Sequence, residues 1–382
     1  MSNQSWPIRS LGDCVKFLSG GTPRKSRTEF WEGDIPWVSS GEMKESRIHD
    51  SSLHITPEGA EAGSRLVPEN TVLAVVRGMS LAKEFRVSIT KREVAFNQDL
   101  KALACKPDVD PEFLFYSLFS QRENIRQLAT EASHGTKKLE TDTLARVGIR
   151  LPKLLIQRRT VEVARTYDEQ MENNRRRMGL LEKAARLLYE EWFVRLRFPG
   201  HEHTPIKNAV PLGWEFKPFE DALVLQRGFD LPKGEWEEGD FPICGSTGII
   251  GHHHESKAKG PGVFTGRSGS LGVVNYVDED YWPHNTALWV REFKEVTPLF
   301  ALFLLRGMNL KQYNGGASVP TLDRKAVHRV EVLIPPHRLI QIFDEQVAPM
   351  FSQLRLLAIQ NQKLRVARDL LLPRLMSGEI EV

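Results

Sequence analysis

The strongest constraint on the fold of this chain is a long repeat that contains no gap. Residues 151–193 recur at 334–376, and a single shift of 183 positions relates the two copies. Under this shift Leu151-Pro152 matches Ile334-Pro335. The repeated units of solenoid proteins are roughly 20–50 residues long, so a period of this length indicates a duplicated half-protein.

Both copies carry apolar residues at alternating steps of three and four, which is the spacing of a coiled-coil seam. We predict two long helices that pack on each other, the first over residues 153–193 and about 60 Å long at 1.5 Å per residue. The alternative is two amphipathic helices on separate cores. Asn174 and Asn361 are polar seam positions that the shift does not relate. The predicted interface consists of Met171, Met178, Leu181 and Leu188 in the first helix and Leu354, Leu357, Leu364 and Leu371 in the second.

Two prolines interrupt the pattern of the second helix. Proline lacks a backbone N–H and its ring collides with the preceding turn, although the first turn of a helix tolerates it. We therefore expect a short helix over residues 338–347, a new helix that begins near Pro349, and an end at Pro373.

The remaining sequence predicts two related globules of mixed helix and strand. In the first we expect strands over residues 33–38, 72–76, 94–103 and 147–151 and a helix over 111–129. Arg77 and Asn97 recur in the second as Arg267 and Asn285. The predicted fold class is α/β (α+β), with two mixed α/β domains separated by two long antiparallel coiled-coil helices in a pseudo-twofold repeat. The expected boundaries are 1–152, 153–198, 199–335 and 336–382, in the order globule, helix, globule, helix.

Composition sets broad limits on the class of protein. The 382 residues suffice for two to three domains, and 41% hydrophobic with 26% charged residues is typical of soluble globular proteins. No apolar run approaches the roughly 18 residues that span a membrane, and the first ten residues lack the apolar core of a signal peptide. Cys14, Cys105 and Cys244 form no CxxC pair, so we expect reduced thiols in the cytoplasm. The net charge of +3 only weakly indicates an anionic partner.

The usual motifs of catalysis are missing from the sequence. It contains no GxxxxGK[ST], GxGxxG, GxSxG or HExxH. It also lacks the Asn/Asp-Pro-Pro-aromatic stretch with which amino-methyltransferases hold a flipped adenine. We therefore predict no catalytic residue. Residues 252–254 are three successive histidines, but neighbours on a strand point to opposite faces, so we predict a solvated or DNA-facing loop and no metal site.

Basic loops between Gly and Pro turns are the better functional candidates. Arginine can form two hydrogen bonds with guanine, and serine can bond phosphates or bases. For any single residue a solvated surface charge is an equally good explanation, but Arg77 and Arg267 recur at matching places in both halves. The candidates for DNA contact are Arg24, Lys25, Arg27, Arg77, Ser80 and Lys83 in the first globule and Arg227, Lys233, His253, Arg267, Ser268 and Ser270 in the second.

Four segments resemble a known family. Asn173-Asn174-Arg175-Arg176 and Glu191-Trp192-Phe193-Val194 resemble the central conserved region of the specificity subunits of type I restriction-modification systems. Leu370-Leu371-Leu372-Pro373-Arg374 resembles their C-terminal conserved region, and Arg77-Gly78 resembles part of their target recognition domains. The resemblance covers nearly the whole chain.

The resemblance implies a division of labour. Each globule would read one half of a split target in double-stranded DNA, and the paired helices would fix the unread gap. Two methyltransferase subunits and the restriction/translocase subunits would be the partners, with no membrane involved. S-adenosylmethionine, ATP and magnesium would belong to these partners, so the chain would be a non-catalytic targeting subunit without a cofactor of its own. The main rival interpretation is a coiled-coil interaction scaffold that does not bind DNA.

Overall fold

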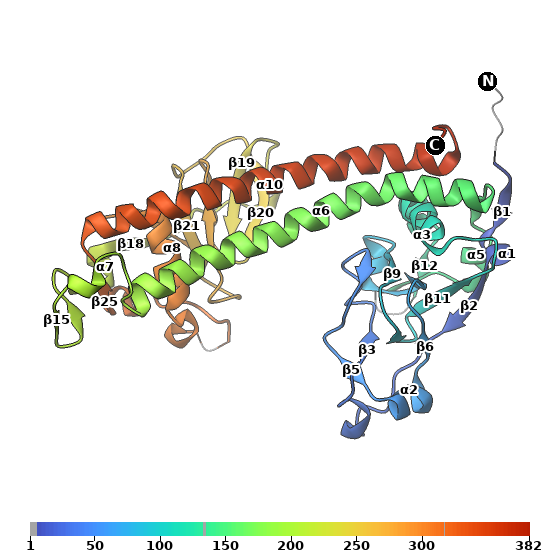
Figure 1. Ribbon diagram of the computed structural model, residues 1–382, viewed down its shortest axis with the longest axis horizontal. Helices are drawn as coiled ribbons and strands as arrows, with labels where there is room; N and C mark the ends of the chain where they lie inside the picture. The colour runs from blue at the N-terminus through green and yellow to red at the C-terminus, as the bar shows by residue number, and fades with distance from the viewer. Residues whose placement is uncertain (1–5, 133–134, 317) are drawn as a thin grey trace. The chain divides into compact units, whose positions relative to one another are not determined.

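The computed structural model describes residues 6–132, 135–316 and 318–382 (Figure 1). They form two compact units. Unit 1 comprises Met1–Asn174 and Ile359–Val382, and unit 2 comprises Arg175–Ala358. Each unit contains one globule and one part of each long helix, α6 (Leu154–Tyr189) and α10 (His337–Ser377). In these described ranges no helix combines the length and apolar character needed to cross a membrane.

The described residues of unit 1 form four sheets, of which the two larger have five and four strands. The strand orders are β2-β11-β7-β9-β4 and β5-β3-β10-β6. The other elements of the unit are short. Its strands are β1 (Ile8–Ser10), β2 (Val15–Ser19), β3 (Ile35–Val38), β4 (Arg47–Ile48), β5 (His54–Ile55), β6 (Leu66–Val67), β7 (Val72–Val75), β8 (Arg77–Gly78), β9 (Val87–Thr90), β10 (Val94–Phe96), β11 (Leu100–Cys105), β12 (Thr130–Glu131), β13 (Lys137–Lys138) and β14 (Gly148–Arg150), and its helices are α1 (Leu11–Cys14), α2 (Pro57–Gly63), α3 (Pro111–Ser120), α4 (Arg122–Gln127) and α5 (Thr141–Ala145).

Unit 2 repeats this topology. Its two larger sheets have the orders β18-β24-β21-β22 and β20-β19-β23. The pair β19 and β23 is parallel, as is the corresponding pair β3 and β10 of unit 1. Its strands are β15 (Ile206–Lys207), β16 (Val210–Pro211), β17 (Glu215–Pro218), β18 (Leu223–Arg227), β19 (Phe241–Gly245), β20 (Gly248–His253), β21 (Gly262–Gly266), β22 (Val274–Val277), β23 (Trp282–Pro283), β24 (Ala287–Phe293) and β25 (Glu331–Ile334), and its helices are α7 (Phe219–Ala222), α8 (Pro298–Gly307) and α9 (Arg324–His328). The repeat expected from the sequence is therefore present in both globules.

Helices α3 and α8 occupy matching places in the two units. Asp110 caps α3 by accepting hydrogen bonds from the amides of Glu112 and Phe113, each at 3.0 Å. Thr297 caps α8 by accepting from the amide of Phe300 at 3.3 Å. Each cap satisfies amide groups that the first helical turn cannot. Both helices bury most of their side chains between a sheet and the long helices, so they join each globule to α6 and α10.

The first long helix confirms the sequence prediction closely. It begins at Leu154 and continues from Tyr189 into a π-helical turn, Glu190–Val194. The prediction of two helices around Pro349 was wrong, since α10 is continuous from His337 to Ser377 and also passes through Pro373. Pro349 and Pro373 are exposed. Water can therefore bond the carbonyl that loses its N–H partner, and packing elsewhere on the helix keeps it intact.

Two shorter elements are divided where single ones were predicted. The strand expected over residues 94–103 is broken between β10 and β11, where Asn97 Oδ1 accepts a hydrogen bond from the amide of Asp99 at 3.1 Å. Such an Asx turn replaces the ladder hydrogen bonds of a strand. The helix expected over residues 111–129 is interrupted at Gln121, between α3 and α4.

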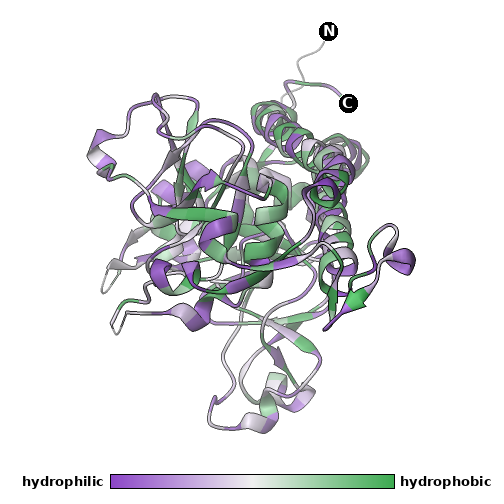
Figure 2. Ribbon diagram, turned by 90° about the vertical axis from the view of Figure 1, so that its left-hand side faces the viewer, coloured by the Kyte–Doolittle hydropathy of each residue, from purple (hydrophilic) through white to green (hydrophobic). Residues whose placement is uncertain are grey.

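The eight predicted seam residues lie on the covered sides of the long helices. Met171 and Leu357 are buried, and the other six are half-buried. Neighbouring apolar residues such as Leu180 and Leu356 are exposed. In unit 1, Asn174 contacts Asn361, and Asp168 contacts Arg368, so the two helix segments of this unit run antiparallel. In Figure 2 the long helices are seen nearly end-on, and their ribbons carry both hydrophilic and hydrophobic colours.

Candidate nucleic-acid interface

In each unit the recurring arginine lies at one end of the larger sheet. In unit 1, β7 ends at Val75, which pairs with Leu100, the first residue of β11, and Arg77 follows one residue later. In unit 2, β21 ends at Gly266, which pairs with Ala287, the first residue of β24, and Arg267 follows. The same strand junction therefore presents the arginine in both units.

The Arg77 site gathers basic residues from three segments. Arg77 and Lys83 are exposed and Ser80 is half-buried. Strand β8, which carries Arg77, pairs with β13 so that Lys138 stands opposite Arg77. Lys137 and Lys138 were not among the candidates, because a two-residue strand gives no periodic signal in the sequence. Lys138 Nζ lies 2.5 Å from Glu140 Oε1, whereas Lys137 adds positive charge beside the junction.

The loop that carries Arg24, Lys25 and Arg27 starts next to this junction. The amide of Gly21 donates to the carbonyl of Phe96 at 2.9 Å, and Thr22 Oγ1 donates to Gln98 Oε1 at 2.7 Å. All three basic side chains of the loop are exposed. The guanidinium of Arg27 lies 5.6 Å from the ring of Phe30, which limits the positions available to it.

The Arg267 site in unit 2 is more closely tied by hydrogen bonds. Arg267 is half-buried, and its Nε donates to the carbonyl of Asn285 at 2.9 Å. The Asn285 amide in turn donates to Asp230, which also lies 3.3 Å from Arg227. This hydrogen bond from Asn285, together with the charge of Arg227, lowers the pKa of Asp230 below its ordinary value. Arg227, Arg267 and Asn285 thus form one ordered group at the end of the sheet.

The other predicted residues of unit 2 are divided between this site and more distant positions. Ser268 is half-buried and forms a β-bridge with Thr321, and Ser270 is exposed in the turn that follows. Both adjoin Arg267. Lys233 is exposed in a single 3-10 turn, Lys233–Glu235, and no hydrogen bond links it to the Arg267 group.

The prediction of a loop at residues 252–254 was wrong. His252 and His253 end strand β20, and His253 is buried, with its ring 5.2 Å from that of Trp282. His253 Nδ1 accepts a hydrogen bond from the amide of Glu237 at 3.2 Å. His253 therefore has a packing role that does not suit contact with DNA. Strand β20 ends at His253, and the chain then bends. The side-chain atoms of His253, His254 and Glu255 that could bind a metal ion lie within 4.8 Å of one another.

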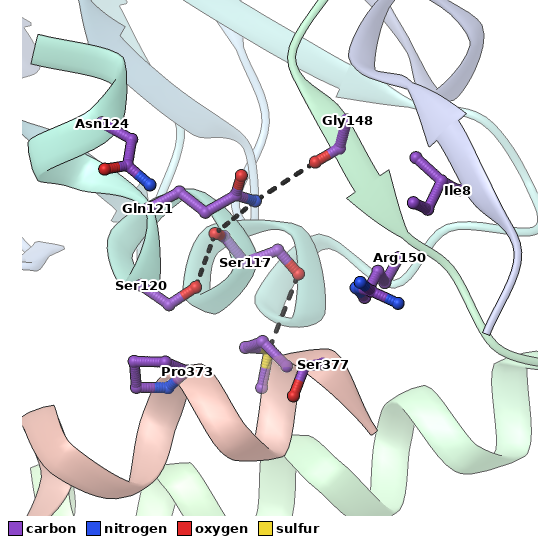
Figure 3. Close-up of a pocket in the computed structure, with 10 residues that line it drawn as sticks. Ile8, Ser117, Ser120, Gln121, Asn124, Gly148, Arg150, Pro373 and Ser377 are labelled. Carbon is purple, nitrogen blue, oxygen red and sulfur yellow. Dashed lines mark hydrogen bonds between the residues drawn. The ribbon is translucent and has the colours of Figure 1, made fainter. Parts of the chain in front are cut away.

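Unit 1 also contains an open cavity of about 420 Å³ between α3, β14 and the end of α10 (Figure 3). Ser117 Oγ donates to Met376 Sδ at 3.6 Å, and Gln121 Nε2 donates to the carbonyl of Gly148 at 3.3 Å. Among the residues that line it, Arg150 alone is charged. General acid–base catalysis needs a side chain that can give or take a proton, most often His, Glu, Asp, Lys, Tyr or Cys. The residues that line this cavity include none of these types, so they do not form an acid–base site.

The cysteines are also poorly suited to nucleophilic chemistry. Burial raises the pKa of Cys105 and of Cys244 to about 12, and burial also raises that of Cys14. The thiolate is the reactive form, and at neutral pH these residues remain thiols.

Comparison with known proteins places the chain in a family. The model of the type I restriction modification DNA specificity domain matches residues 3–183 and 211–365. The specificity subunit of the type I restriction enzyme MjaIX from Methanocaldococcus jannaschii is 25% identical over 416 residues, which cover 99% of this chain and 94% of that protein. The EcoR124I/EcoR124II specificity subunit from Escherichia coli is 29% identical over 162 residues, which cover 42% of this chain and 40% of that protein.

The fold agrees with a solved structure. The type I restriction-modification S subunit from M. genitalium matches with a TM-score of 0.60 at 19% identity, over 98% of this chain and 97% of that chain. The family match includes both globules and most of both long helices. The resemblance inferred from the repeated segments is thereby confirmed, and the chain belongs to the specificity subunits of type I restriction-modification systems.

Proposed function

We propose that the two globules read the two halves of a bipartite DNA target and that the chain carries the enzymes that act on it. The observation that supports this most directly is the repeated junction with Arg77 in unit 1 and Arg267 in unit 2. In unit 2, Arg267 bonds the backbone of Asn285. In unit 1 the exposed Gln98 precedes Asp99, whose carbonyl accepts a hydrogen bond from the backbone amide of Arg77 at 3.3 Å. Arginine suits guanine and an amide suits adenine in the major groove, so each junction carries residue types that discriminate bases.

The basic residues around each junction supply the sequence-independent part of binding. In unit 1 these are Arg24, Lys25, Lys83 and Lys137, and in unit 2 Arg227 has the corresponding role. Contacts with phosphates orient a protein on the duplex and release counterions. Affinity for DNA should therefore fall steeply with salt.

The scaffolding role is supported by an apolar stripe on α10. Leu356, Ile359, Val366 and Leu370 are all exposed and recur at steps of three, seven and four. Exposed apolar stripes at helical spacing mark sites where another helix packs. We assign this stripe to a methyltransferase subunit. The restriction/translocase subunits would then join through the methyltransferases, and S-adenosylmethionine, ATP and Mg²⁺ would be bound by these partners.

Two experiments test the proposal. The first measures DNA binding by gel shift at salt concentrations from roughly 50 to 200 mM, with and without the methyltransferase. Over this range, rising salt strongly weakens binding that depends on phosphate contacts. A scaffold without DNA contacts would give no shifted band in either case. The second follows transfer of labelled methyl groups to DNA. We expect transfer only when the methyltransferase is present, and transfer by the purified chain alone would contradict the assignment.

A further experiment assigns each globule to one half-site. Residues 1–152 are replaced by the corresponding segment of another family member, and the methylated sequence is determined with the same methyltransferase. One half of the target should change while the other half stays the same. A change in both halves would contradict the model of one globule per half-site.

A further inference from the structure

The long helices bury polar side chains in unit 1 where they bury apolar ones in unit 2. Five buried polar residues of unit 1 each correspond, under the shift of 183, to a residue without a polar side chain. All the unit 2 counterparts are buried or half-buried. The matching pairs, with the unit 1 residue first, are Gln157 and Ile340, Thr160 and Phe343, Asp168 and Phe351, Asn174 and Leu357, and Arg368 and Ala185.

Three of these buried residues in unit 1, namely Asp168, Asn174 and Arg368, are paired across the two helices. Asn174 Nδ2 donates to Asn361 Oδ1 at 2.9 Å and to Gln360 Oε1 at 3.1 Å. Arg368 donates from its NH1 group to Asp168 Oδ1 at 2.6 Å. In each pair one residue lies on α6, in the first half of the chain, and its partner lies on α10, in the second half.

Two copies of the first half could not form these pairs. Under the shift of 183, Met178 of α6 corresponds to Asn361 of α10, and Ala185 corresponds to Arg368. A helix contact of the same register between two first halves would set Asn174 opposite Met178 and Asp168 opposite Ala185. The Asn174 amide would then lose its acceptors on α10, and the Asp168 carboxylate would lose its guanidinium. Each would keep one partner of the first half, Gln170 and Tyr116 respectively, so both would be buried with incomplete pairing, which is costly.

Two copies of the second half meet the same obstacle. The shift would set Asn361 opposite Leu357 and Arg368 opposite Phe351. The Arg368 guanidinium would keep its bonds to the neighbouring Asp369 but would face an aromatic ring in place of the buried Asp168 carboxylate, and it would lose part of the charge pairing that compensates for its desolvation. A homotypic contact, between two first halves or two second halves, is therefore less stable than the heterotypic contact between a first and a second half.

We infer that these buried pairs make the helix contact selective: α6 accepts α10 of the second half as its partner and rejects a second copy of the first half. The inference concerns pairing and does not depend on DNA binding. Its consequence, that every assembled protein carries two different readers, rests on the proposed function.

A nicked form of the full chain tests this selectivity. Asn208 and Ala209 form the exposed tip of the β15–β16 hairpin, with φ values of 53° and 62°. A protease site is inserted between them, and the folded protein is cleaved after purification. Mass-labelled and unlabelled nicked proteins are mixed, partly unfolded in urea and returned to buffer, and native mass spectrometry identifies the pairs. Mixed labels within heterotypic pairs show that exchange has taken place.

The wild-type protein should give only pairs of a first with a second half. Homotypic pairs in statistical proportion would overturn the inference. A failure of the two halves to pair again would also overturn it, because the helix contact would then not join them. Since no DNA is present, the result does not depend on whether the globules read DNA.

Two variants should change the selectivity in opposite directions. Asn174→Leu gives the first half the residue found at 357, so first-half pairs should rise about tenfold while second-half pairs stay rare. Asn361→Met gives the second half the residue found at 178, so second-half pairs should rise instead. Asn173→Leu, at an exposed position of the same helix, is the matched control and should change neither. If each variant raised both kinds of pair, or neither, the assignment to Asn174 and Asn361 would be wrong.

Discussion

Asn174 of α6 donates a hydrogen bond to Asn361 of α10 over 2.9 Å, although the repeat of the chain places neither residue at the position of the other. Asn174 is fully buried. Asn361 also donates to the carbonyl of Met171 at 3.2 Å, so the pair is joined to the backbone of α6. A buried asparagine pair of this kind sets the register of two helices at some cost in stability.

The first prediction concerns the energy of this pair. Asn174→Leu or Asn361→Met alone leaves a buried amide without its partner and should lower the free energy of unfolding by about 1–3 kcal/mol. The double variant copies the apolar layer of unit 2 and should be nearly neutral or more stable. Urea denaturation of all four proteins gives the coupling energy as a double-mutant cycle. Additive effects of the two substitutions would show that the hydrogen bond contributes nothing.

The second prediction concerns the buried ion pair of Asp168 and Arg368. Arg368→Ala leaves the Asp168 carboxylate uncompensated and should cost about 3–5 kcal/mol of unfolding free energy. Asp168 also accepts a hydrogen bond from Tyr116 at 2.8 Å, so the loss should loosen α3 as well. Arg365→Ala, on the exposed side of the same helix, is the control and should change stability by less than about 0.5 kcal/mol. Equal costs for the two variants would exclude a special role for the pair.

The sequence predicted the long helices well because their signal is periodic over many turns. The seam from Met171 to Leu188 lies on the covered side of α6 as the spacing indicates. Pro349 was misjudged because helix propensity is local, whereas the stability of α10 comes from packing of residues such as Phe343 and Val347 along its length. The break at Asn97 depends on hydrogen bonds between its side chain and Asp99, which leave no periodic signal in the sequence.

The third prediction is a pH dependence that arises in unit 1. Burial would raise the pKa of Glu112, but hydrogen bonds from Lys91 and Arg165 and the charge of Arg47 lower it to about 2. Because the folded value lies below the ordinary 4.5, the contribution of Glu112 is present above pH 4.5 and is lost as the pH falls through about 2.

Glu112→Gln should therefore cost about 3 kcal/mol at pH 7, and its difference from wild type should shrink between about pH 4.5 and pH 2. Urea denaturation at several pH values measures this. Glu58→Gln, at an exposed position of α2, should show no such trend. A Glu112→Gln penalty that stayed constant over this range would indicate lost packing instead of lost charge.

The fourth prediction has the opposite sign and lies in unit 2. Burial raises the pKa of Asp344 from 3.8 to about 6, against the opposing effect of a 3.0 Å hydrogen bond from Thr297. The folded state binds this proton more tightly, so the contribution is fully present below pH 3.8 and is lost as the pH rises through about 6. Asp344→Asn keeps an acceptor for Thr297 and should stabilise the protein at pH 8 but not at pH 4. Urea denaturation at both pH values measures this. As a control, Glu345→Gln at the exposed neighbouring position should change the free energy of unfolding by the same small amount at both pH values.

The candidate DNA site was harder to predict than the fold. Arg77 and Arg267 were predicted because they recur, and the structure places both at the same strand junction, while their contact with DNA stays a prediction. Lys137 was missed because only the pairing of β8 with β13 brings it to Arg77. His253 was included for its sequence neighbourhood, but its ring is packed against Trp282. Contacts that arise between distant segments leave no local pattern in the sequence.

The last prediction separates the two half-sites by one residue each. Arg77→Ala should relax discrimination at one half of the target by about 1–3 kcal/mol, and Arg267→Ala should do so at the other half. Arg146 and Arg329 are matched controls, since the shift of 183 relates them and both are exposed. Arg146 follows α5, which packs on α1 ahead of the first residue of β2, at the end of the sheet opposite Arg77.

Binding is measured against libraries in which each half-site is randomised in turn, with the methyltransferase present. The controls should lower affinity weakly and equally for every sequence, because a distant arginine contributes only to the general field. Relaxation at both half-sites by Arg77→Ala alone would mean that unit 1 reads the whole target. Relaxation at neither would move base recognition away from the junction, and the loop of Arg24 and Lys25 would be the next segment to substitute.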